Sequence, residues 1–526
     1  MKSTDDRSAR LPESRSINLP RAECADIGLL LEGTFPYVYG GVSSWVYQII
    51  RAFPELTFAI VFLGSRAEDY GALKYELPPN VVHVETHFLH EKRPPPALHS
   101  RDGDAQAFAT IERAHRYFRT PHAHRADIAQ VGELLGELSA GGRLSESDQL
   151  YSRRGWRFIT ESYRAFCSDP SFVDYFWTVR TMHAPIWRLT RIADEFIPVR
   201  AYHSVSTGYA GFLGTLLKRR SGRPLILSEH GIYTKERKID LFQAQWIAEH
   251  RSAFRGEGSD GNYFRQMWIR FFEALGQLCY DAADPIVALF EANRQRQIAD
   301  GAAAERTRSI PNGIDVARYA PLRARRGQAV PPVLCLIGRV VPIKDIKTFI
   351  RAMRVVANRM PQAQGWIVGP EDEDAAYGAE CRSLVQGLDL GGQVRFLGFR
   401  QMQDVLHQVG VVVLSSISEA LPLAVLEGFA AGVPAVCTDV GSCRELVYGA
   451  ERADDADRAL GAAGRIVGIA DPQALAAAAL GLLNDTAQWQ AASAAAIRRV
   501  ERFYTQERMV TAYREIYQTA LAANGD

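Results

Sequence analysis

The sequence predicts an α/β protein with two doubly wound domains, each built on a parallel sheet. The chain has 526 residues, a length that suggests two or more domains. Short apolar runs alternate with helical patterns in two separate series, as parallel sheets with helical crossovers require. The segment "RSIPNGIDVARYAP", with an Asn-Gly turn signal and a proline on each side, separates the two series.

Bulk composition narrows the classes of function. Hydrophobic residues make up 47% and charged residues 23% of the chain, as in ordinary globular proteins. A net charge of +1 lacks the basic signature of nucleic-acid binding. The seven cysteines are scattered and without CxxC spacing, which favours a reducing compartment. The polar first residues lack a signal-peptide pattern, and no apolar run is long enough to span a bilayer. We therefore expect a cytoplasmic protein, open to recruitment to the inner face of the membrane by partners.

The first domain is predicted over residues 25–305, after a mobile arm at 1–24. Within it, residues from about 90 to 198 interrupt the strand pattern and carry aromatic residues spaced three and four apart, which predicts a helical insertion. The other expected elements are a strand at 27–31, a Gly40-Gly41 loop, a helix from about Ser43, strands at 58–65 and 81–89, and strand-helix units in "RAYHSVSTGYAGFLG", "PLILSEHGIYT" and "DPIVALFEANRQRQIADG".

The second domain is predicted over residues 306–503, followed by an amphipathic helix in 504–526. Its six β-rich runs alternate with helical patterns, as a doubly wound sheet requires. These runs are "PVLCLIGRV", "QGWIVGP", "VRFLGF", "VGVVVLSS", "PAVCTDV" and "GRIVGI".

Two glutamates in "SEALPLAVLEG" raise the question of whether they act on one bond. A strand should end near Leu414, Pro422 suits an early helical position, and Gly432 marks the helix end. Glu419 then precedes the helix and Glu427 lies one to two turns inside it, so separate roles fit better than a glycosidase carboxylate pair. At the carboxyl end of the sheet, Glu419 would meet a ligand, with the helix N-terminus aimed at a phosphate. Spacing alone equally allows two solvated helix-end charges.

With four other segments in matching order, this element resembles the signature of retaining family-4 glycosyltransferases of the GT-B fold. The segments are "FPYVYGGVSSWV", "IPNGID", "GRVVPIKD" and "AVCTDVGSCRELV". The resemblance is strong over 306–500 and looser over 25–90 and 199–300. The insertion, "SEHGIYTKER" and "EGTFPYVYGGVSSWV" are most similar to the PelF family, the cytosolic glycosyltransferases of Pel exopolysaccharide biosynthesis.

The resemblance implies two Rossmann-like domains facing a cleft, with the acceptor on the first, the nucleotide sugar on the second and the last helix crossing back. It implies that a hexose moves from a UDP-sugar onto a growing polysaccharide, with retention and without a covalent enzyme intermediate. The implied partners are the donor, the polysaccharide acceptor and inner-membrane exopolysaccharide synthase proteins, and no nucleic acid. No obligatory cofactor is expected.

The resemblance also assigns roles on the second domain. Arg339 and Lys344, in the loop that begins at Gly338, should bind the diphosphate, where cations stabilise the charge of the leaving group. Glu427 should accept hydrogen bonds from the ribose, and Glu419 should contact the donor sugar near its reacting carbon. Backbone N–H groups at Leu421 and Leu423 should assist, whereas Pro422 has none.

On the first domain, His230 of "SEHG" matches a position that faces the donor sugar, and Gly40 and Gly41 match a loop that borders the leaving phosphate and the acceptor. A lone histidine also suits a structural role, and a Gly-Gly pair suits an ordinary turn. Three groups stay open as ligand contacts or ordinary surface and core residues: Lys235–Arg237, Tyr37 with Tyr39, and the less favoured His203. No metal site is expected, because the histidines are dispersed and an Asp-x-Asp nucleotide-metal motif is missing.

The sequence disfavours three alternative functions. A glucan or glycogen-type synthase is disfavoured, because the N-terminal loop reads "VYGGV" and lacks a "KTGGL" lysine motif. A catalytically idle nucleotide-binding scaffold of a membrane complex does not need the set Arg339, Lys344, Glu419 and Glu427. A nucleotide-sugar epimerase on the same fold is disfavoured by the Glu-x7-Glu element.

We predict that Glu419→Gln and Lys344→Ala each abolish sugar transfer while leaving the fold intact, because both groups would act on the reacting end of the donor. Transfer assays with circular dichroism as the folding check test this. Unchanged turnover in either variant contradicts the site assignment.

Overall fold

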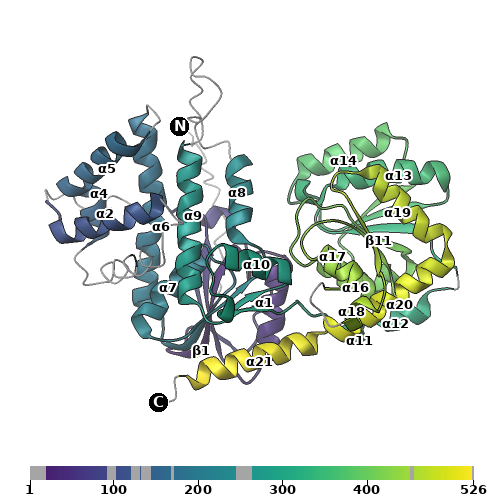
Figure 1. The fold of residues 1–526 in the computed structure, drawn as a ribbon, viewed down its shortest axis with the longest axis horizontal. Helices are drawn as coiled ribbons and strands as arrows, with labels where there is room; N and C mark the ends of the chain where they lie inside the picture. The colour runs from purple at the N-terminus through teal and green to yellow at the C-terminus, as the bar shows by residue number, and fades with distance from the viewer. Residues whose placement is uncertain are drawn as a thin grey trace, which may run out of the picture.

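The computed structural model describes residues 19–91, 102–119, 131, 144–167, 171–243, 263–327, 329–450 and 455–523. Within these ranges the chain forms two lobes, each built on a parallel sheet (Figure 1). The predicted α/β class with two doubly wound sheets is confirmed. Of the predicted mobile arm, residues 1–18 lie outside the description, as do large parts of the insertion, at 92–101, 120–130, 132–143 and 168–170.

The sheet of the N-terminal lobe has the described strand order β3-β2-β1-β4-β5-β6-β7, with all pairs parallel. The order reverses between β1 and β4, which is where a doubly wound sheet binds ligands. The strands are β1 (Ala25–Glu32), β2 (Phe58–Gly64), β3 (Val81–Phe88), β4 (Val199–Ser204), β5 (Leu225–Glu229), β6 (Ile286–Ala288) and β7 (Thr307–Ser309).

Helices cover both faces of this sheet. They are α1 (Gly41–Ala52), α7 (Tyr209–Ser221), α8 (Tyr233–Gln243), α9 (Tyr263–Ala282) and α10 (Glu291–Ala299). Along β1, Ile27 and Leu29 pack into the core under α1, whereas Leu30 packs into the core under α7 and α9. Side chains of a strand alternate between faces, so a strand covered on both sides is apolar throughout.

The predicted insertion forms helices beside the N-terminal sheet: α2 (Ala105–Arg119), α4 (Glu146–Tyr151), α5 (Arg153–Phe166) and α6 (Phe172–Glu195). Phe158, Tyr175 and Trp187 share one continuous hydrophobic core with Phe272 of α9. The insertion therefore extends the N-terminal core.

The sheet of the C-terminal lobe has the described order β10-β9-β8-β11-β12-β13, again parallel and with its switch point between β8 and β11. Each of the six predicted runs contains one of its strands. They are β8 (Val333–Ile337), β9 (Gln364–Val368), β10 (Val394–Gly398), β11 (Val411–Leu414), β12 (Ala435–Thr438) and β13 (Gly464–Val467).

The remaining helices belong to the C-terminal half of the chain. They are α11 (Val316–Tyr319), α12 (Pro321–Arg325), α13 (Ile346–Arg359), α14 (Ala375–Gly387), α15 (Met402–Val405), α16 (Leu423–Ala430), α17 (Cys443–Tyr448), α18 (Asp455–Arg458), α19 (Pro472–Asn484), α20 (Thr486–Phe503) and α21 (Gln506–Ala522). Short 3₁₀ turns occupy Ala67–Asp69, Ala304–Arg306, Pro342–Lys344 and Leu406–Gln408.

The chain passes between the lobes twice, and the two passages lie side by side. The N–H of Ile314 donates to the carbonyl of Tyr504 (3.0 Å), and the N–H of Gln506 donates to the carbonyl of Ile314 (2.9 Å). Gly313 is needed here, because a Cβ would lie 2.2 Å from the carbonyl oxygen of Thr505. After this crossing, α21 runs along the N-terminal lobe (Figure 1), where its Tyr513 enters the core that contains Trp45.

One strand was not predicted. Residues 307–309 pair with β6 and extend the N-terminal sheet beyond residue 305, where the sequence placed the domain boundary. The run Thr-Arg-Ser is too short and polar to signal a strand, and its place depends on pairing with a buried neighbour.

A buried ion pair stabilises the C-terminal lobe. Arg499 on α20 is fully buried, donates to the carboxylate of Asp457 (2.8 Å) and also donates to the carbonyls of Val447 and Gly461. The guanidinium thus joins α20 to α17, to α18 and to the turn that follows α18.

We predict that Asp457→Ala lowers the free energy of unfolding by about 3–5 kcal/mol, because it leaves the buried Arg499 charge without its carboxylate. The matched control is Glu380→Ala, which removes a surface ion pair with Lys347 and should cost less than about 1 kcal/mol. Calorimetry of both variants measures the difference, and equal effects would contradict this account.

Candidate functional site

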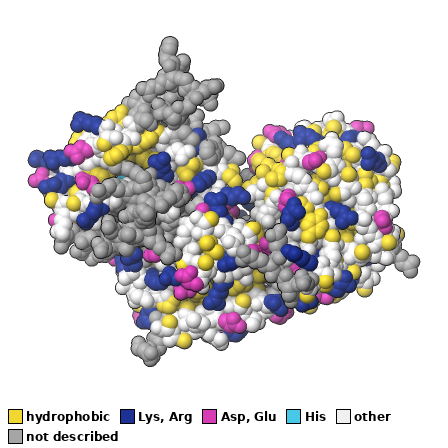
Figure 2. Space-filling view, viewed as in Figure 1, with side chains coloured by type: hydrophobic (Ala, Val, Ile, Leu, Met, Phe, Trp, Pro, Cys, Tyr) yellow, Lys and Arg dark blue, Asp and Glu magenta, His cyan; other side chains and the backbone are white. Residues whose placement is uncertain are grey.

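A cleft of about 1140 Å³ opens between the carboxyl ends of the two sheets. Seen from the face in Figure 2, the surface is indented between the lobes, and acidic and basic side chains are interspersed over both. Every residue of the predicted site lines this cleft: Gly40, Gly41, His230, Gly338, Arg339, Lys344, Glu419, Leu421, Leu423 and Glu427. They converge because they lie in or just after the loops that follow β1, β5, β8 and β11, whose carboxyl ends face the cleft.

On the C-terminal lobe, the loop after β8 and the loop after β11 are tied together. The hydroxyl of Ser415 donates to the carbonyls of Lys344 (2.9 Å) and Asp345 (3.0 Å). The N–H of Ile417 donates to the carbonyl of Ile343 (2.9 Å). These bonds bring the Gly338–Lys344 loop beside Glu419.

The two predicted cations are paired with carboxylates. Lys344 forms an ion pair with Glu419, and both side chains are largely buried. The hydroxyl of Ser416 donates a second hydrogen bond to the same Glu419 oxygen (2.6 Å). Arg339 forms a more exposed pair with Glu373 (2.6 Å). A phosphate group that enters the cleft would compete with these carboxylates for both cations.

Glu427 has a different partner. The hydroxyl of Tyr319, at the end of α11, donates to one of its oxygens (2.9 Å). Burial raises the pKa of Glu427, and the hydrogen bond from Tyr319 opposes that rise. Since Glu419 and Glu427 contact different groups, the structure gives each glutamate a separate environment.

The first turn of α16 also faces the cleft. Leu421, Pro422 and Leu423 line it, and no side chain of the described residues caps this helix terminus. Uncapped N–H groups at a helix N-terminus favour an anion. Pro422 is the residue just before the helix, whereas the sequence placed it inside. Gly441 (φ 53°) packs against the backbone of the loop that carries Glu419. A side chain would not fit there, because a Cβ would lie 2.4 Å from the carbonyl oxygen of Glu419.

On the N-terminal lobe, Gly40 and Gly41 begin α1 and face open space. A Cβ at either position would meet no described atom within 4 Å. The room above this backbone is therefore available to a ligand.

His230 follows β5 and is 5% exposed. Its ring packs edge-on against Trp45 (4.5 Å between centroids), and its Nε2 has no hydrogen-bond partner within the described residues. Burial lowers the pKa of His230 to about 3, so the imidazole is neutral at ordinary pH.

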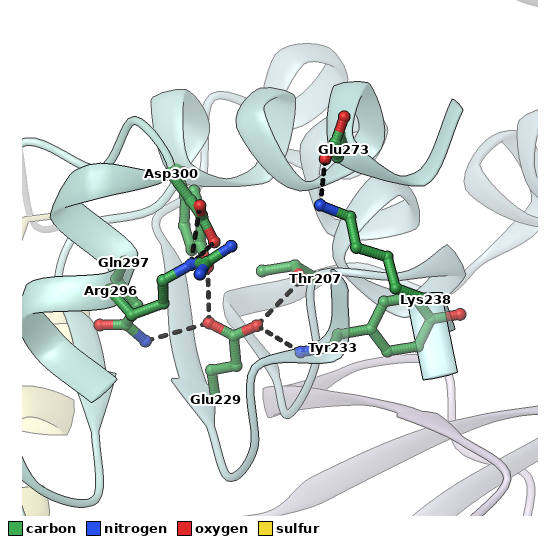
Figure 3. A network of polar contacts seen from close by, with 9 residues as sticks. Thr207, Glu229, Tyr233, Lys238, Glu273, Arg296, Gln297 and Asp300 are labelled. Atoms are coloured by element: carbon green, nitrogen blue, oxygen red, sulfur yellow. Dashed lines mark hydrogen bonds and ion pairs between the residues drawn. The ribbon is translucent and has the colours of Figure 1, made fainter. Parts of the chain in front are cut away.

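The strand before His230 is anchored by Glu229 (Figure 3). Its carboxylate accepts hydrogen bonds from the hydroxyls of Thr207 (3.0 Å) and Tyr280 (2.7 Å), the amide of Gln297 (3.1 Å) and the N–H of Tyr233 (3.1 Å). Burial raises the pKa of Glu229, and these donors oppose the rise. Figure 3 shows the donors pointing to the Glu229 carboxylate from separate elements. Because one donor is the backbone N–H of Tyr233, the network holds the chain both before and after His230.

Next to this network, Glu32 at the end of β1 accepts a hydrogen bond from the hydroxyl of Tyr233 (2.8 Å). Arg237 lies near the same carboxylate (3.8 Å) and donates to that hydroxyl (2.9 Å). All three residues line the cleft.

Three candidate residues lie elsewhere. His203 is buried and bonds the hydroxyls of Tyr517 (2.8 Å) and Ser228 (2.8 Å), so it is a core histidine. Tyr37 packs against Phe62, and Tyr39 is 61% exposed; neither lines the cleft.

Two site residues were missed in the sequence, Tyr319 and Ser416. Both stand in segments that were singled out, "IPNGIDVARYAP" and "VGVVVLSS". Their hydrogen bonds to the two glutamates depend on tertiary contacts that no spacing signals.

Across the part of the chain described, no group of three His, Cys, Asp or Glu side chains could hold a metal ion. No helix in the described ranges is long and apolar enough to cross a membrane.

We predict that acid destabilises the fold through His230. Its pKa is about 3 in the folded protein and 6.5 ordinarily, so its contribution to stability is complete above about pH 6.5 and is lost as pH falls toward 3. Between about pH 7 and pH 5 the loss should be about 2 kcal/mol. Gln does not titrate, so the free energy of unfolding of His230→Gln, measured in urea relative to wild type, should rise by about 2 kcal/mol as pH falls from about 7 to about 5. A constant difference between the two proteins would show that the imidazole is not buried as described.

Comparison with curated proteins gives partial matches. A D-inositol 3-phosphate glycosyltransferase of Kineococcus radiotolerans is 31% identical over 47% of this chain and 61% of its own length. An exopolysaccharide phosphotransferase of Streptomyces coelicolor is 34% identical over 30% of this chain and 16% of its own. A glycogen synthase of Mycobacterium tuberculosis is 28% identical over 40% of this chain and 48% of its own. The chain spans less than two thirds of the length of each.

Solved structures match the whole fold. Anabaena HepE in complex with UDP and glucose superposes with a TM-score of 0.56 at 17% identity, over 94% of this chain and 99% of that one. Sucrose-phosphate synthase of Thermosynechococcus elongatus gives 0.56 at 17% identity, over 95% and 100%. At these identities the likeness establishes the fold alone, which is GT-B.

Two family models match the chain. Residues 331–485 match the model described as glycosyl transferases group 1. Residues 25–305, more than half of the chain, match the domain of unknown function DUF3492. The chain belongs to the DUF3492 family, with a glycosyl transferases group 1 segment following the DUF3492 domain.

Proposed function

We propose that the protein is a retaining hexosyltransferase that moves a hexose from a UDP-sugar onto a growing exopolysaccharide. The observation that carries the proposal is the cleft between the two sheets, where Arg339, Lys344, Glu419 and Glu427 meet His230 from the opposite lobe. The match of 331–485 to glycosyl transferases group 1 supports the reaction class.

In this proposal the C-terminal lobe holds the donor. The diphosphate lies at the uncapped N-terminus of α16. There it forms ion pairs with Lys344 and Arg339, in place of their present pairs with Glu419 and Glu373. Glu427, already held through one oxygen by Tyr319, receives the ribose hydroxyls on the other. Glu419 is released to contact the sugar. The cations stabilise the charge that the leaving UDP acquires, in a site that closure of the lobes shields from water.

The N-terminal lobe would present the acceptor. A neutral His230, held in place by Trp45 and the Glu229 network, can accept or donate a hydrogen bond at the sugar without adding a charge. The Gly40-Gly41 backbone would border the phosphate and acceptor. Transfer would follow front-face substitution, and neither a metal nor another cofactor would be required.

We further propose that the enzyme is of the PelF type and acts in Pel polysaccharide synthesis for biofilm, in the cytoplasm beside inner-membrane synthase proteins. Support comes from the insertion, from "SEHGIYTKER" and from an exopolysaccharide-related name among partial relatives. UDP as the nucleotide is supported by HepE, whose structures contain UDP with glucose and UDP-glucose.

We predict that the purified protein binds UDP more tightly than ADP or GDP in calorimetric titration. Lys344→Ala and Arg339→Ala should each weaken UDP binding about 10- to 100-fold, the loss expected for a charged hydrogen bond to phosphate. Lys347→Ala is the matched control, because Lys347 pairs with Glu380 and does not line the cleft.

Absence of binding to all three nucleotides would count against the nucleotide-binding scaffold as well as against an enzyme active alone, and would favour a site that forms only with membrane partners. Stronger binding of ADP would favour the glucan-synthase alternative. Equal weakening in Lys347→Ala would contradict the placement of the diphosphate.

A further inference from the structure

Four carboxylates line the cleft among the described residues: Glu32, Glu236, Glu419 and Glu427. Three of them are held by other side chains, Glu32 by Tyr233, Glu419 by Lys344 and Glu427 by Tyr319. The carboxylate of Glu236 has no hydrogen bond or ion pair within the described part of the chain. It is thus the one carboxylate there that is free to receive a proton or a hydroxyl group from a ligand.

The backbone places Glu236 beside Gly231, the residue that follows His230. Glu236 lies in the first turn of α8, where its N–H donates to the carbonyl of Ile232 (3.0 Å). Its Oε1 comes so close to Gly231 that a Cβ there would lie 2.0 Å away. A glycine directly after His230 therefore allows the carboxylate to approach the loop that carries the imidazole.

Unpartnered polar atoms at the same cleft point to a ligand. The Nε2 of His230 and the Oδ1 of Asn312 belong to side chains that are 5% and 4% exposed, and neither atom has a partner within the described residues. Both residues line the cleft. Buried polar atoms in proteins are nearly always hydrogen-bonded, so two that border one cleft fit a ligand rich in hydroxyl groups.

We propose that Glu236 is the catalytic base, which takes the proton from the attacking hydroxyl of the acceptor sugar. The proposal rests on the proposed function. As the acceptor oxygen bonds to the anomeric carbon, the bond from that carbon to the phosphate oxygen breaks and its electron pair leaves with UDP. The acceptor's proton passes to a Glu236 oxygen and then to solvent.

The charges around Glu236 suit this role. Glu236 is an exposed residue at the open cleft, and the protein around its carboxyl removes part of its hydration and raises the pKa of Glu236 to about 7. Glu229 on β5 and Asp240 on α8 raise it further, while Lys235 and Arg237 oppose the rise. A base with a pKa near the working pH combines an ionised fraction with proton affinity.

The experiment measures UDP release from UDP-glucose, UDP-N-acetylglucosamine and UDP-N-acetylgalactosamine, with water as the attacking hydroxyl. Wild type should gain rate as pH rises through about 7, where Glu236 loses its proton. Glu236→Gln should lower kcat about 100-fold or more, the usual contribution of a general base, and should lose this limb of the pH profile. Its affinity for UDP should stay within about twofold of wild type, since the diphosphate lies on the other lobe.

The matched variant is Asp240→Asn, one turn along the same helix and outside the cleft lining. This variant should keep the maximal rate, and its rate should rise at a lower pH than that of wild type. The reason is that the substitution removes a negative charge that raises the pKa of Glu236. A structural role of helix α8 would not produce this shift.

The outcomes separate the two proposals. If wild type binds UDP and hydrolyses a UDP-sugar but Glu236→Gln keeps both rate and pH profile, the leaving phosphate is the base and this inference fails alone. If Glu236→Gln loses UDP binding, the residue is structural and the inference fails. If wild type neither binds UDP nor releases it from any donor, the proposed function fails as well.

Discussion

The pairing of Ile314 with the backbone from Tyr504 to Gln506 is the constraint on which the cleft depends. Both connections between the lobes run through this point, and α21 then buries Met509, Tyr513 and Tyr517 in the N-terminal core. This linker is anchored in both lobes, and the carboxyl ends of the two sheets face each other across the cleft. In the proposed function, closure of the lobes would take place about this point.

Within the cleft, each charged group of the C-terminal lobe already has a partner. Lys344 is neutralised by Glu419, Arg339 by Glu373, and Glu427 is held by Tyr319. Partly buried charges need such compensation when no ligand is bound. A phosphate that binds here would replace Glu419 and Glu373 as the partner of the two cations, and would free both carboxylates for other contacts. This arrangement also explains why Glu419 and Glu427 do not behave as a pair: each belongs to a different set of contacts.

Around His230, the N-terminal face is organised by a buried hydrogen-bond network and by ring packing. Glu229 is satisfied by four donors, and the imidazole of His230 is kept uncharged by burial against Trp45. The Glu229 network holds the loop, whereas among the described residues the Nε2 of His230 and the carboxylate of Glu236 have no hydrogen-bond partner. A polar group fixed by its backbone rather than by its own hydrogen bonds remains available to a ligand.

The sequence by itself determined the fold class, the six strands of the second sheet and the whole set of predicted residues that converge on the cleft. It did so because periodicity and loop position decide which residues follow a strand, and parallel sheets collect those residues at one edge. Tertiary structure alone decided the partners. Tyr319 reaches Glu427 across 108 positions, Lys344 reaches Glu419 across 75, and β7 exists only beside β6. It also separated His230, which borders the cleft, from His203, which lies in the core. His203 lies near the end of the buried strand β4 and His230 directly follows the buried strand β5, so their sequence contexts are alike. What distinguishes them is the packing of His203 against α21.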